Sequence, residues 1–394
     1  MGPRSGGDGS INMGKACHIY SAAPGGPRGR GGKDENFIRS AANGLWCCAY
    51  HGDLIDKDKG DGYSAATLFS WKKLAEARIK KLMDHVPSPL GWVESVGFNE
   101  FFGRDYPPQI NLSRNTLLWG ENGSGKTVLM ELAATVTNSR YAWRFLEPAD
   151  AASGKKIRAA GVKGTVSYST VDVPDKVVHI EVCGDEIARA ENGVVCLLPP
   201  GDIEIIHLRA QDLELHSRDV DHEQMLMRAL NVDKSALLAL TRISEKPLLP
   251  GRSRLRFTKK YDDEEEAIYE LEFQILGRDF YVPFSRLAGS EQVRLVIDLL
   301  IVKAREVAKQ RLTLLLIDSS IAGLDGANFK RLLTALAMED FQSVVVVSNI
   351  VEEDILERDS TGKMKLAQLD YLEPWRLALL PSIAERPVRA ENET

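Results

Sequence analysis

The chain has 394 residues, of which 44% are hydrophobic and 27% are charged, with a formal net charge of −6 at pH 7. This length allows a large core plus a smaller module. The sequence contains no apolar run of about eighteen residues, no evenly spaced cysteine framework among its five cysteines, and no charged-then-apolar start. We therefore expect a soluble, cytoplasmic protein without a membrane partner.

The charge is unevenly distributed along the chain. Residues 1–81 carry 13 Lys and Arg against 8 Asp and Glu, a net charge of +5, and the remainder carries a net charge of −11. A basic segment favours contact with nucleic acid, although small basic excesses are common on soluble surfaces. Of the two parts of the chain, the amino-terminal segment is therefore the one expected to face nucleic acid.

Four short motifs follow one another in this basic segment. They are Cys17-His18-Ile19, the stretches of residues 21–28 and 43–51, and Leu54-Ile55-Asp56. Together they resemble one group of HNH endonuclease domains, over about residues 11–82. The resemblance implies a small ββα-metal fold that cleaves phosphodiester bonds with a divalent metal ion.

The HNH resemblance also implies a role for each residue. Such a site needs a histidine to activate water, a cation to stabilise the phosphate, and an asparagine to orient the histidine. His18 would be the general base, Asn43 the orienting residue, and His51 a metal ligand on the helix that follows. The spacing from Asn43 to His51 is expected to place a loop residue beside the first turn of that helix.

Cys48 allows an alternative function for His51. Relatives carry an upstream cysteine pair that would complete a zinc site with Cys48 and position 51, and this sequence shows no such pair. His51 could hold zinc instead of the catalytic cation, or Cys47 and Cys48 could be ordinary small buried residues. His18 could likewise be a satisfied core histidine. The sequence leaves these alternatives open.

A helix is predicted to close the first domain. Apolar residues recur at helical spacing over residues 64–86, and Pro87-Ser88-Pro89 ends the pattern. We therefore predict two domains, an HNH nuclease-like domain over residues 1–86 and a second domain over residues 87–394.

Residues 120–127 form the clearest motif of the second domain. They read Gly-Glu-Asn-Gly-Ser-Gly-Lys-Thr and follow the apolar run Asn115–Trp119, which is the strand, loop and helix order of a phosphate-binding P-loop. Lys126 would contact the β and γ phosphates, and the Thr127 hydroxyl would bind Mg²⁺. The predicted cofactors are ATP and Mg²⁺. The loop residues predicted to bind them are Asn122, Gly123, Ser124, Gly125, Lys126 and Thr127.

Two apolar runs further along end in polar residues. The run Leu312–Asp318 predicts a buried strand whose terminal carboxylate holds Mg²⁺ through water. Residues 343–348 predict a second buried strand, which ends before Asn349.

Other segments predict the surroundings of this core. Residues 164–183, 254–258 and 269–281 alternate apolar and polar side chains, as in an antiparallel sheet beside the nucleotide core. The acidic run 262–266 is expected in a solvated turn between two such strands, and residues 221–240 are expected to be helical.

Two further motifs give the P-loop a family resemblance. Leu287-Ala288-Gly289-Ser290-Glu291 looks like an ABC-type signature, and the seven residues after Asp318 resemble the D-loop pattern that ends at Asp325. Over about residues 90–372 the chain resembles the compact SMC/RecF-like branch of the ABC ATPases. The resemblance implies an α/β P-loop NTPase with an antiparallel β subdomain. It adds Ser290, Asp325 and Asn349 to the nucleotide site.

The sequence departs from this family at residues that act in hydrolysis. Ser319 replaces the glutamate that orients the attacking water, and serine cannot act as a general base at neutral pH. Ala288 replaces the signature serine, for which Ser290 could substitute, and Asn349 stands where the family has a histidine. We therefore expect weak ATP hydrolysis.

The resemblance implies a homodimer that encloses two nucleotides, because the signature of one ABC subunit completes the site of the other. A further protein subunit is an alternative. The function predicted from the two resemblances is an ATP-gated HNH endonuclease that cleaves nucleic acid, DNA in the first place, in bacterial defence against phages or plasmids. The alternative is a non-cleaving DNA-binding or repair ATPase with a degenerate HNH module.

Overall fold

The structure is a computed structural model. It describes residues 4–6, 9–11, 14–83, 91–101, 109–146, 161–170, 173–184, 186–213, 222–243, 252–261, 267–275, 279–318 and 324–380. Contacts divide the chain into two compact units, Met1–Lys80 and Lys81–Thr394. No helix in the described ranges is both long and apolar enough to cross a membrane.

The first unit is built on an antiparallel ribbon. Strand β3 (Gly14–His18) pairs with β4 (Gly44–Cys48), so that His18 lies opposite Gly44 and Gly14 lies opposite Cys48. Its helices are α1 (Glu35–Arg39), α2 (Ala49–Asp56) and α3 (Ala65–Met83), and the short strands β1 (Arg4–Gly6) and β2 (Gly9–Ile11) pair with each other. The small core consists of Cys17, Ile19, Ile55 and Leu68. Helix α3 matches the helix predicted over residues 64–86, whose last three residues and the prolines after them lie outside the described residues.

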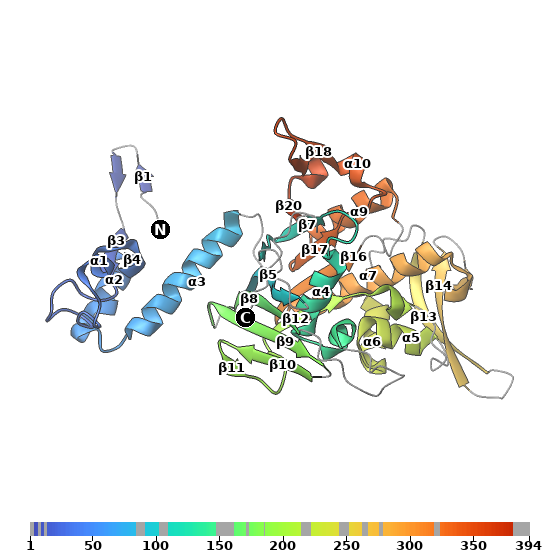
Figure 1. The fold of residues 1–394 in the computed structure, drawn as a ribbon, viewed down its shortest axis with the longest axis horizontal. Helices are drawn as coiled ribbons and strands as arrows, with labels where there is room; N and C mark the ends of the chain where they lie inside the picture. Colours follow the sequence, from blue (N-terminus) through green and yellow to red (C-terminus); the bar gives the residue numbers. More distant parts are fainter. Residues whose placement is uncertain are drawn as a thin grey trace, which may run out of the picture. The chain divides into compact units, whose positions relative to one another are not determined.

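The second unit contains a five-stranded parallel sheet in the order β12-β16-β17-β7-β20 (Figure 1). Its strands are β7 (Asn115–Trp119), β12 (Ile203–His207), β16 (Leu312–Asp318), β17 (Gln342–Val346) and β20 (Arg376–Leu379). Every residue of β16 and β17 is buried, because both faces of the sheet are covered. The neighbours Leu117 and Leu118 accordingly enter two different cores.

Helices pack on both faces of this sheet. Helix α4 (Lys126–Thr135) belongs to the core that contains Leu118, whereas α7 (Gly289–Ala308) and α9 (Gly326–Ala337) belong to the core that contains Leu117. Parallel strands need such crossover connections, and their carboxyl ends therefore gather at one edge of the sheet. That edge is where the predicted P-loop and Asp318 lie.

The alternating segments form two antiparallel sheets instead of the single predicted one. The first has the order β11-β10-β9-β8-β5-β6, and the second has the order β13-β14-β15. The strands of the first are β5 (Gly91–Phe101), β6 (Ile110–Asn111), β8 (Val162–Thr170), β9 (Lys176–Cys183), β10 (Glu186–Glu191) and β11 (Val194–Val195). Those of the second are β13 (Arg252–Tyr261), β14 (Ala267–Ile275) and β15 (Tyr281–Pro283). The acidic run 262–266 lies outside the described residues.

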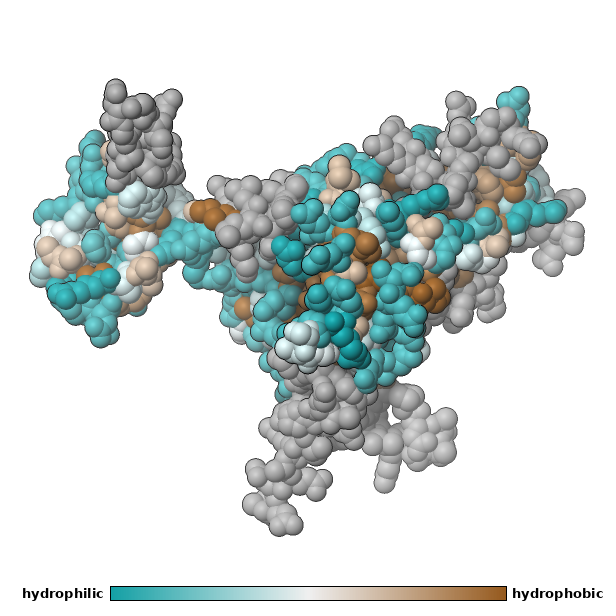
Figure 2. Space-filling view, turned by 90° about the horizontal axis from the view of Figure 1, so that it is seen from above, coloured by the Kyte–Doolittle hydropathy of each residue, from teal (hydrophilic) through white to brown (hydrophobic). Residues whose placement is uncertain are grey.

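The segment predicted as one helix over residues 221–240 is two helices. They are α5 (His222–Leu230) and α6 (Lys234–Ile243), separated at Asn231, whose positive φ of 50° breaks the helical backbone. The described chain ends with α10 (Glu352–Ile355), the hairpin of β18 (Leu356–Arg358) and β19 (Met364–Leu366), and β20. Seen from above, the described surface is mainly hydrophilic, with small apolar patches (Figure 2).

Candidate functional site

The P-loop joins β7 to α4 through two glycines with left-handed backbone. Gly123 has φ 77° and Gly125 has φ 91°, a region that side chains disfavour. Gly120 is also required, because a Cβ there would lie 2.6 Å from the Ser124 hydroxyl. The loop therefore reaches the amino terminus of α4, where backbone N–H groups and the helix dipole favour an anion.

Lys126 holds its ammonium group at the loop. Its Nζ donates to the carbonyl oxygens of Gly120, at 2.5 Å, and of Glu121, at 3.0 Å. Burial lowers the pKa of Lys126, and the nearby carboxylates of Asp318 and Glu352 only partly oppose this shift. A bound phosphate would supply the negative charge that this site lacks.

Thr127 and Asp318 meet although 191 residues separate them. The Thr127 hydroxyl donates to Oδ2 of Asp318 at 2.9 Å, because β7 and β16 bring their carboxyl ends to the same edge of the sheet. A hydroxyl and a carboxylate are oxygen ligands of the kind that Mg²⁺ prefers. The pair fits the predicted metal position in the chemistry of its donor atoms.

A cavity of about 440 Å³ opens over this loop. Its volume lies within the usual range of small-molecule sites, about 300–1,000 Å³. It brings together the predicted residues Asn122, Gly123, Ser124, Gly125, Lys126, Thr127, Asp318 and Asn349. A larger cavity, of about 1080 Å³, runs along β19 and β20 but contains none of these residues.

Ser290 and Asp325 do not line the cavity of their own chain. Ser290 is exposed in the first turn of α7, and Asp325 is exposed at the start of α9, where its carboxylate accepts from the N–H of Asn328 at 2.8 Å. Both are therefore accessible to another molecule. Ser319 lies outside the described residues.

Arg144 is a cavity residue that the motifs did not indicate. It comes from the 3₁₀ turn Ser139–Phe145, lines the cavity, and places its Nε 2.5 Å from Oε2 of the buried Glu131. Burial raises the pKa of Glu131, and Arg144 opposes that shift. No spacing rule links Arg144 to the P-loop, so only the folded chain shows that a second cation borders the site.

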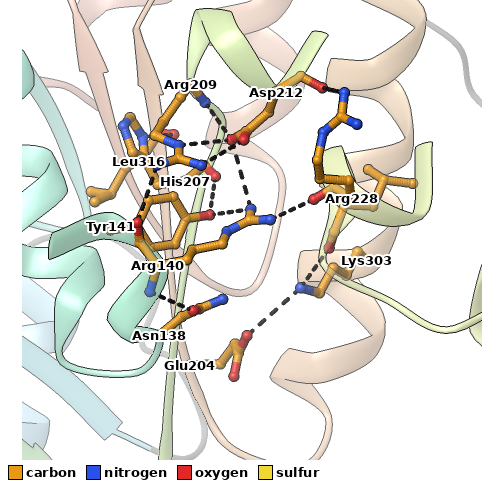
Figure 3. A network of polar contacts seen from close by, with 11 residues as sticks. Asn138, Arg140, Tyr141, Glu204, His207, Arg209, Asp212, Arg228, Lys303 and Leu316 are labelled. Atoms are coloured by element: carbon orange, nitrogen blue, oxygen red, sulfur yellow. Dashed lines mark hydrogen bonds and ion pairs between the residues drawn. The ribbon is translucent and has the colours of Figure 1, made fainter. Parts of the chain in front are cut away.

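A buried polar network lies at the carboxyl end of β12 (Figure 3). Asp212 accepts from Arg209 at 2.7 Å, and Arg140 donates to the Tyr141 hydroxyl, which in turn donates to the carbonyl of His207. Burial lowers the pKa of His207 to about 4, although its Nδ1 lies 3.3 Å from the carbonyl oxygen of Leu316. The network holds β12 in place beside β16. Leu316, whose carbonyl His207 approaches, lies two residues before Asp318.

In the first unit, the structure places His18 and Asn43 at the same end of the ribbon. His18 is exposed at the end of β3, and Asn43 is fully buried just before β4. The Asn43 amide accepts from the N–H of Tyr20 at 2.8 Å and donates to the carbonyls of Tyr20, at 2.9 Å, and Ile38, at 3.1 Å. Asn43 therefore positions the backbone that follows His18.

His51 lies at the other end of the ribbon. Its Nδ1 is 3.0 Å from Sγ of Cys48, which pairs with Gly14, whereas His18 pairs with Gly44. Four residues of strand separate the two ends, about 13 Å. The structure does not bring His51 to His18 or to Asn43.

The structure adds no third ligand to Cys48 and His51, the two metal ligands predicted for the first unit, among the residues that it describes. Cys48 and His51 lie side by side, but no group of three or more His, Cys, Asp or Glu side chains that could hold a metal occurs in the part of the chain that is described. A structural zinc ion needs four ligands. The described residues therefore do not fit a zinc site.

Arg28 ends the motif of residues 21–28, and the structure gives it a role that the sequence did not assign. Its buried guanidinium donates to the carbonyls of Ile19, at 2.7 Å, and Ile55, at 2.6 Å, and pairs with Asp56 at 2.6 Å. It thereby ties the chain after His18 to the end of α2.

No family model matches this chain, and no curated protein matches it either. The comparison with solved structures, in contrast, finds chains that are similar to this one. The head of an SMC protein bound to the C-terminal winged-helix domain of ScpA is 17% identical, with 71% of this chain and 97% of that chain covered and a TM-score of 0.46. The SMC head from Thermotoga maritima is 15% identical, with 70% of this chain and 99% of that chain covered and a TM-score of 0.38. The recombination mediator RecF with ATP is 13% identical, with 66% of this chain and 95% of that chain covered and a TM-score of 0.43.

None of these comparisons shows an HNH domain. The strand order, the P-loop geometry and the Thr127–Asp318 contact are observations on this chain itself. They confirm the predicted α/β P-loop core.

Proposed function

We propose that the second unit binds ATP with Mg²⁺. The observation that carries this proposal is the meeting of Lys126, Thr127 and Asp318 in one cavity above the amino terminus of α4. Lys126 would contact the β and γ phosphates, and Thr127 would bind Mg²⁺, with Asp318 holding it through water. Arg144 adds positive charge at the border of the cavity.

Hydrolysis is expected to be slow, and the nucleotide is expected to act as a latch. Ser319 and Asn349 replace the groups that the family uses to activate water and to contact the γ phosphate. The exposed Ser290 and Asp325 would complete the site of a second copy, which makes a nucleotide-bound homodimer the proposed assembly. A partner ATPase or a further subunit is the alternative.

For the first unit we propose a nuclease module that acts on DNA under the control of the bound nucleotide, in bacterial defence. The exposed His18, the Asn43 clamp beside it and the net charge of +5 over residues 1–81 support this proposal. A non-cleaving DNA-binding ATPase is the second candidate. It is favoured by the Cys48–His51 pair, which supplies two ligands where a structural zinc ion needs four, and by the separation of His51 from His18 along the ribbon.

ATP binding is tested by titrating the full-length protein with a fluorescent ATP analogue and Mg²⁺. We expect Lys126→Ala to weaken binding at least tenfold, because it removes the cation at the phosphates. Lys309→Ala is the matched control, since Lys309 is exposed and pairs with Glu306 on α7. Equal affinity of the Lys126→Ala variant and the wild type for the ATP analogue would refute the proposal. Hydrolysis of many ATP molecules per second would refute the expectation that the bound nucleotide is hydrolysed slowly.

The nuclease module is tested with plasmid DNA, Mg²⁺ or Mn²⁺, and ATP or a slowly hydrolysed analogue. We expect cleavage that His18→Ala abolishes. Cleavage that survives this substitution would exclude His18 as the base. DNA binding without cleavage under every condition would favour the second candidate.

A further inference from the structure

One face of the β3–β4 ribbon is exposed to solvent. Alternation along the strands places the side chains of one set toward α2, where a Cβ on Gly52 would lie 2.9 Å from Sγ of Cys17. The other set faces away from α2 and includes Ala16, His18 and Trp46, all exposed. We call Gly14, Ala16, His18, Gly44 and Trp46 the open ribbon face; Cys48, which ends β4, instead turns its Sγ to the N–H of His51 in α2.

Trp46 is the largest side chain on the open ribbon face. Trp46 is 53% exposed. Its indole lies over the backbone of β3, and there is room for it there because Gly14 has no side chain. A Cβ on Gly14 would overlap the Nε1, Cε2 and Cζ2 atoms of Trp46. The cross-strand neighbours on this face are small, because Ala16 lies opposite Trp46 and Gly44 lies opposite His18.

Aromatic side chains continue beyond Trp46 toward α2. Cys48 contacts His51, and the ring of His51 meets that of Tyr50 edge-on, with centroids 5.3 Å apart. Tyr50 is 71% exposed. Exposed rings therefore lie at both ends of the ribbon, His18 at one end and His51 with Tyr50 at the other, with Trp46 on the strand between them, and the ribbon is about 13 Å long.

We propose that the open ribbon face binds an unpaired segment of nucleic acid, with one base stacked on Trp46 and another on Tyr50. Stacking needs a base whose face is free, and in a duplex the neighbouring pairs cover it. The net charge of +5 over residues 1–81 complements a polyanion. This inference rests on the proposed nucleic-acid role of the first unit and names its substrate class, with His18 at the end of the bound strand.

The test measures binding of the full-length protein to a fluorescein-labelled deoxythymidine 20-mer and to a mixed-sequence duplex of the same length, by anisotropy. We expect Trp46→Ala to weaken single-strand binding about tenfold and to leave duplex binding within about twofold. Trp46→Phe should recover most of the loss because it keeps an aromatic ring. Trp71→Ala is the matched control, since Trp71 is an exposed indole on α3 that packs against Tyr63.

Three outcomes would overturn the inference. They are equal single-strand affinities of the Trp46→Ala and Trp71→Ala variants, an equal loss of duplex and single-strand binding in Trp46→Ala, and absence of single-strand binding by the wild type. None of these outcomes bears on ATP binding through Lys126 or on cleavage through His18, which are measured in separate assays. A failed inference is therefore distinguishable from a failed proposed function.

Discussion

At the scale of single residues, Lys126 and Asn43 show two uses of backbone carbonyl groups. The ammonium of Lys126 is held at the mouth of a cavity by two carbonyls of its own loop, ready for an anion. The amide of Asn43 is fully buried and satisfied by backbone groups of Tyr20 and Ile38. Lys126 is therefore positioned to meet an anion in the cavity, whereas Asn43 holds the backbone that follows His18.

Asn43→Ala should destabilise the first unit by about 2–4 kcal/mol, because it leaves three backbone groups without their partner, the buried carbonyl of Ile38 and the partly buried N–H and carbonyl of Tyr20. Asn43→Asp should cost at least as much, because it keeps the acceptor for the N–H of Tyr20 but replaces the donor to the carbonyls of Tyr20 and Ile38 with a buried carboxylate oxygen. The measurement is urea denaturation followed by far-UV circular dichroism. A loss below about 0.5 kcal/mol in the alanine variant would show that the Asn43 amide is dispensable.

His207 should make the second unit sensitive to acid. Its pKa is about 4 in the folded chain against 6.5 for an exposed histidine, so the unfolded chain binds the proton more readily. The stability it contributes is present above pH 6.5 and is lost as the pH falls toward 4, about 2 kcal/mol between pH 7 and pH 5. Asp318 and Asp212 favour the proton and Arg209 opposes it, but burial dominates.

The comparison variant is His207→Gln, whose amide can still donate to the carbonyl of Leu316. Urea denaturation at pH 7 and pH 5 should show a stability loss that is smaller in the variant by about 2 kcal/mol. Equal losses in both proteins would exclude His207 as the source.

At the scale of elements, buried parallel strands were the most predictable part of this chain. Strand β16 coincides with the predicted run Leu312–Asp318, because a strand covered on both faces is continuously apolar. The alternating segments were also correctly predicted as strands, but their grouping into one sheet was wrong. Alternation reports that one face is buried and carries no information on which strand is the neighbour.

Helix ends depended on individual polar residues. Asp325 caps α9 by accepting from the N–H of Asn328, although the sequence suggested only a D-loop role for it. Asp325→Ala should therefore cost about 1 kcal/mol in the absence of nucleotide, whereas Asp325→Asn should be nearly neutral. Thermal denaturation of the nucleotide-free protein checks this, and equal melting temperatures of the alanine variant and the wild type would contradict it.

At the scale of the whole molecule, two units with separate cores should unfold in separate steps. Calorimetry of the full-length protein should show two transitions, of which Asn43→Ala lowers one and Mg²⁺-ATP raises the other. At a ligand concentration of 100 times Kd, the stabilisation amounts to about 2.7 kcal/mol. Lys126→Ala should remove that shift. A single transition that responds to both changes would show that the units fold as one.

The sequence by itself determined the P-loop and the carboxylate beside it, because these parts are local: a strand, a glycine-rich loop and a helix start in consecutive residues, and a second strand that ends in Asp318. Only the tertiary structure decided which distant side chains join them. Arg144 reaches the cavity through a 3₁₀ turn without any sequence pattern, and β4 carries His51 away from His18. Spacing along a chain fixes the residues within an element, whereas the direction and length of each element fix which residues meet.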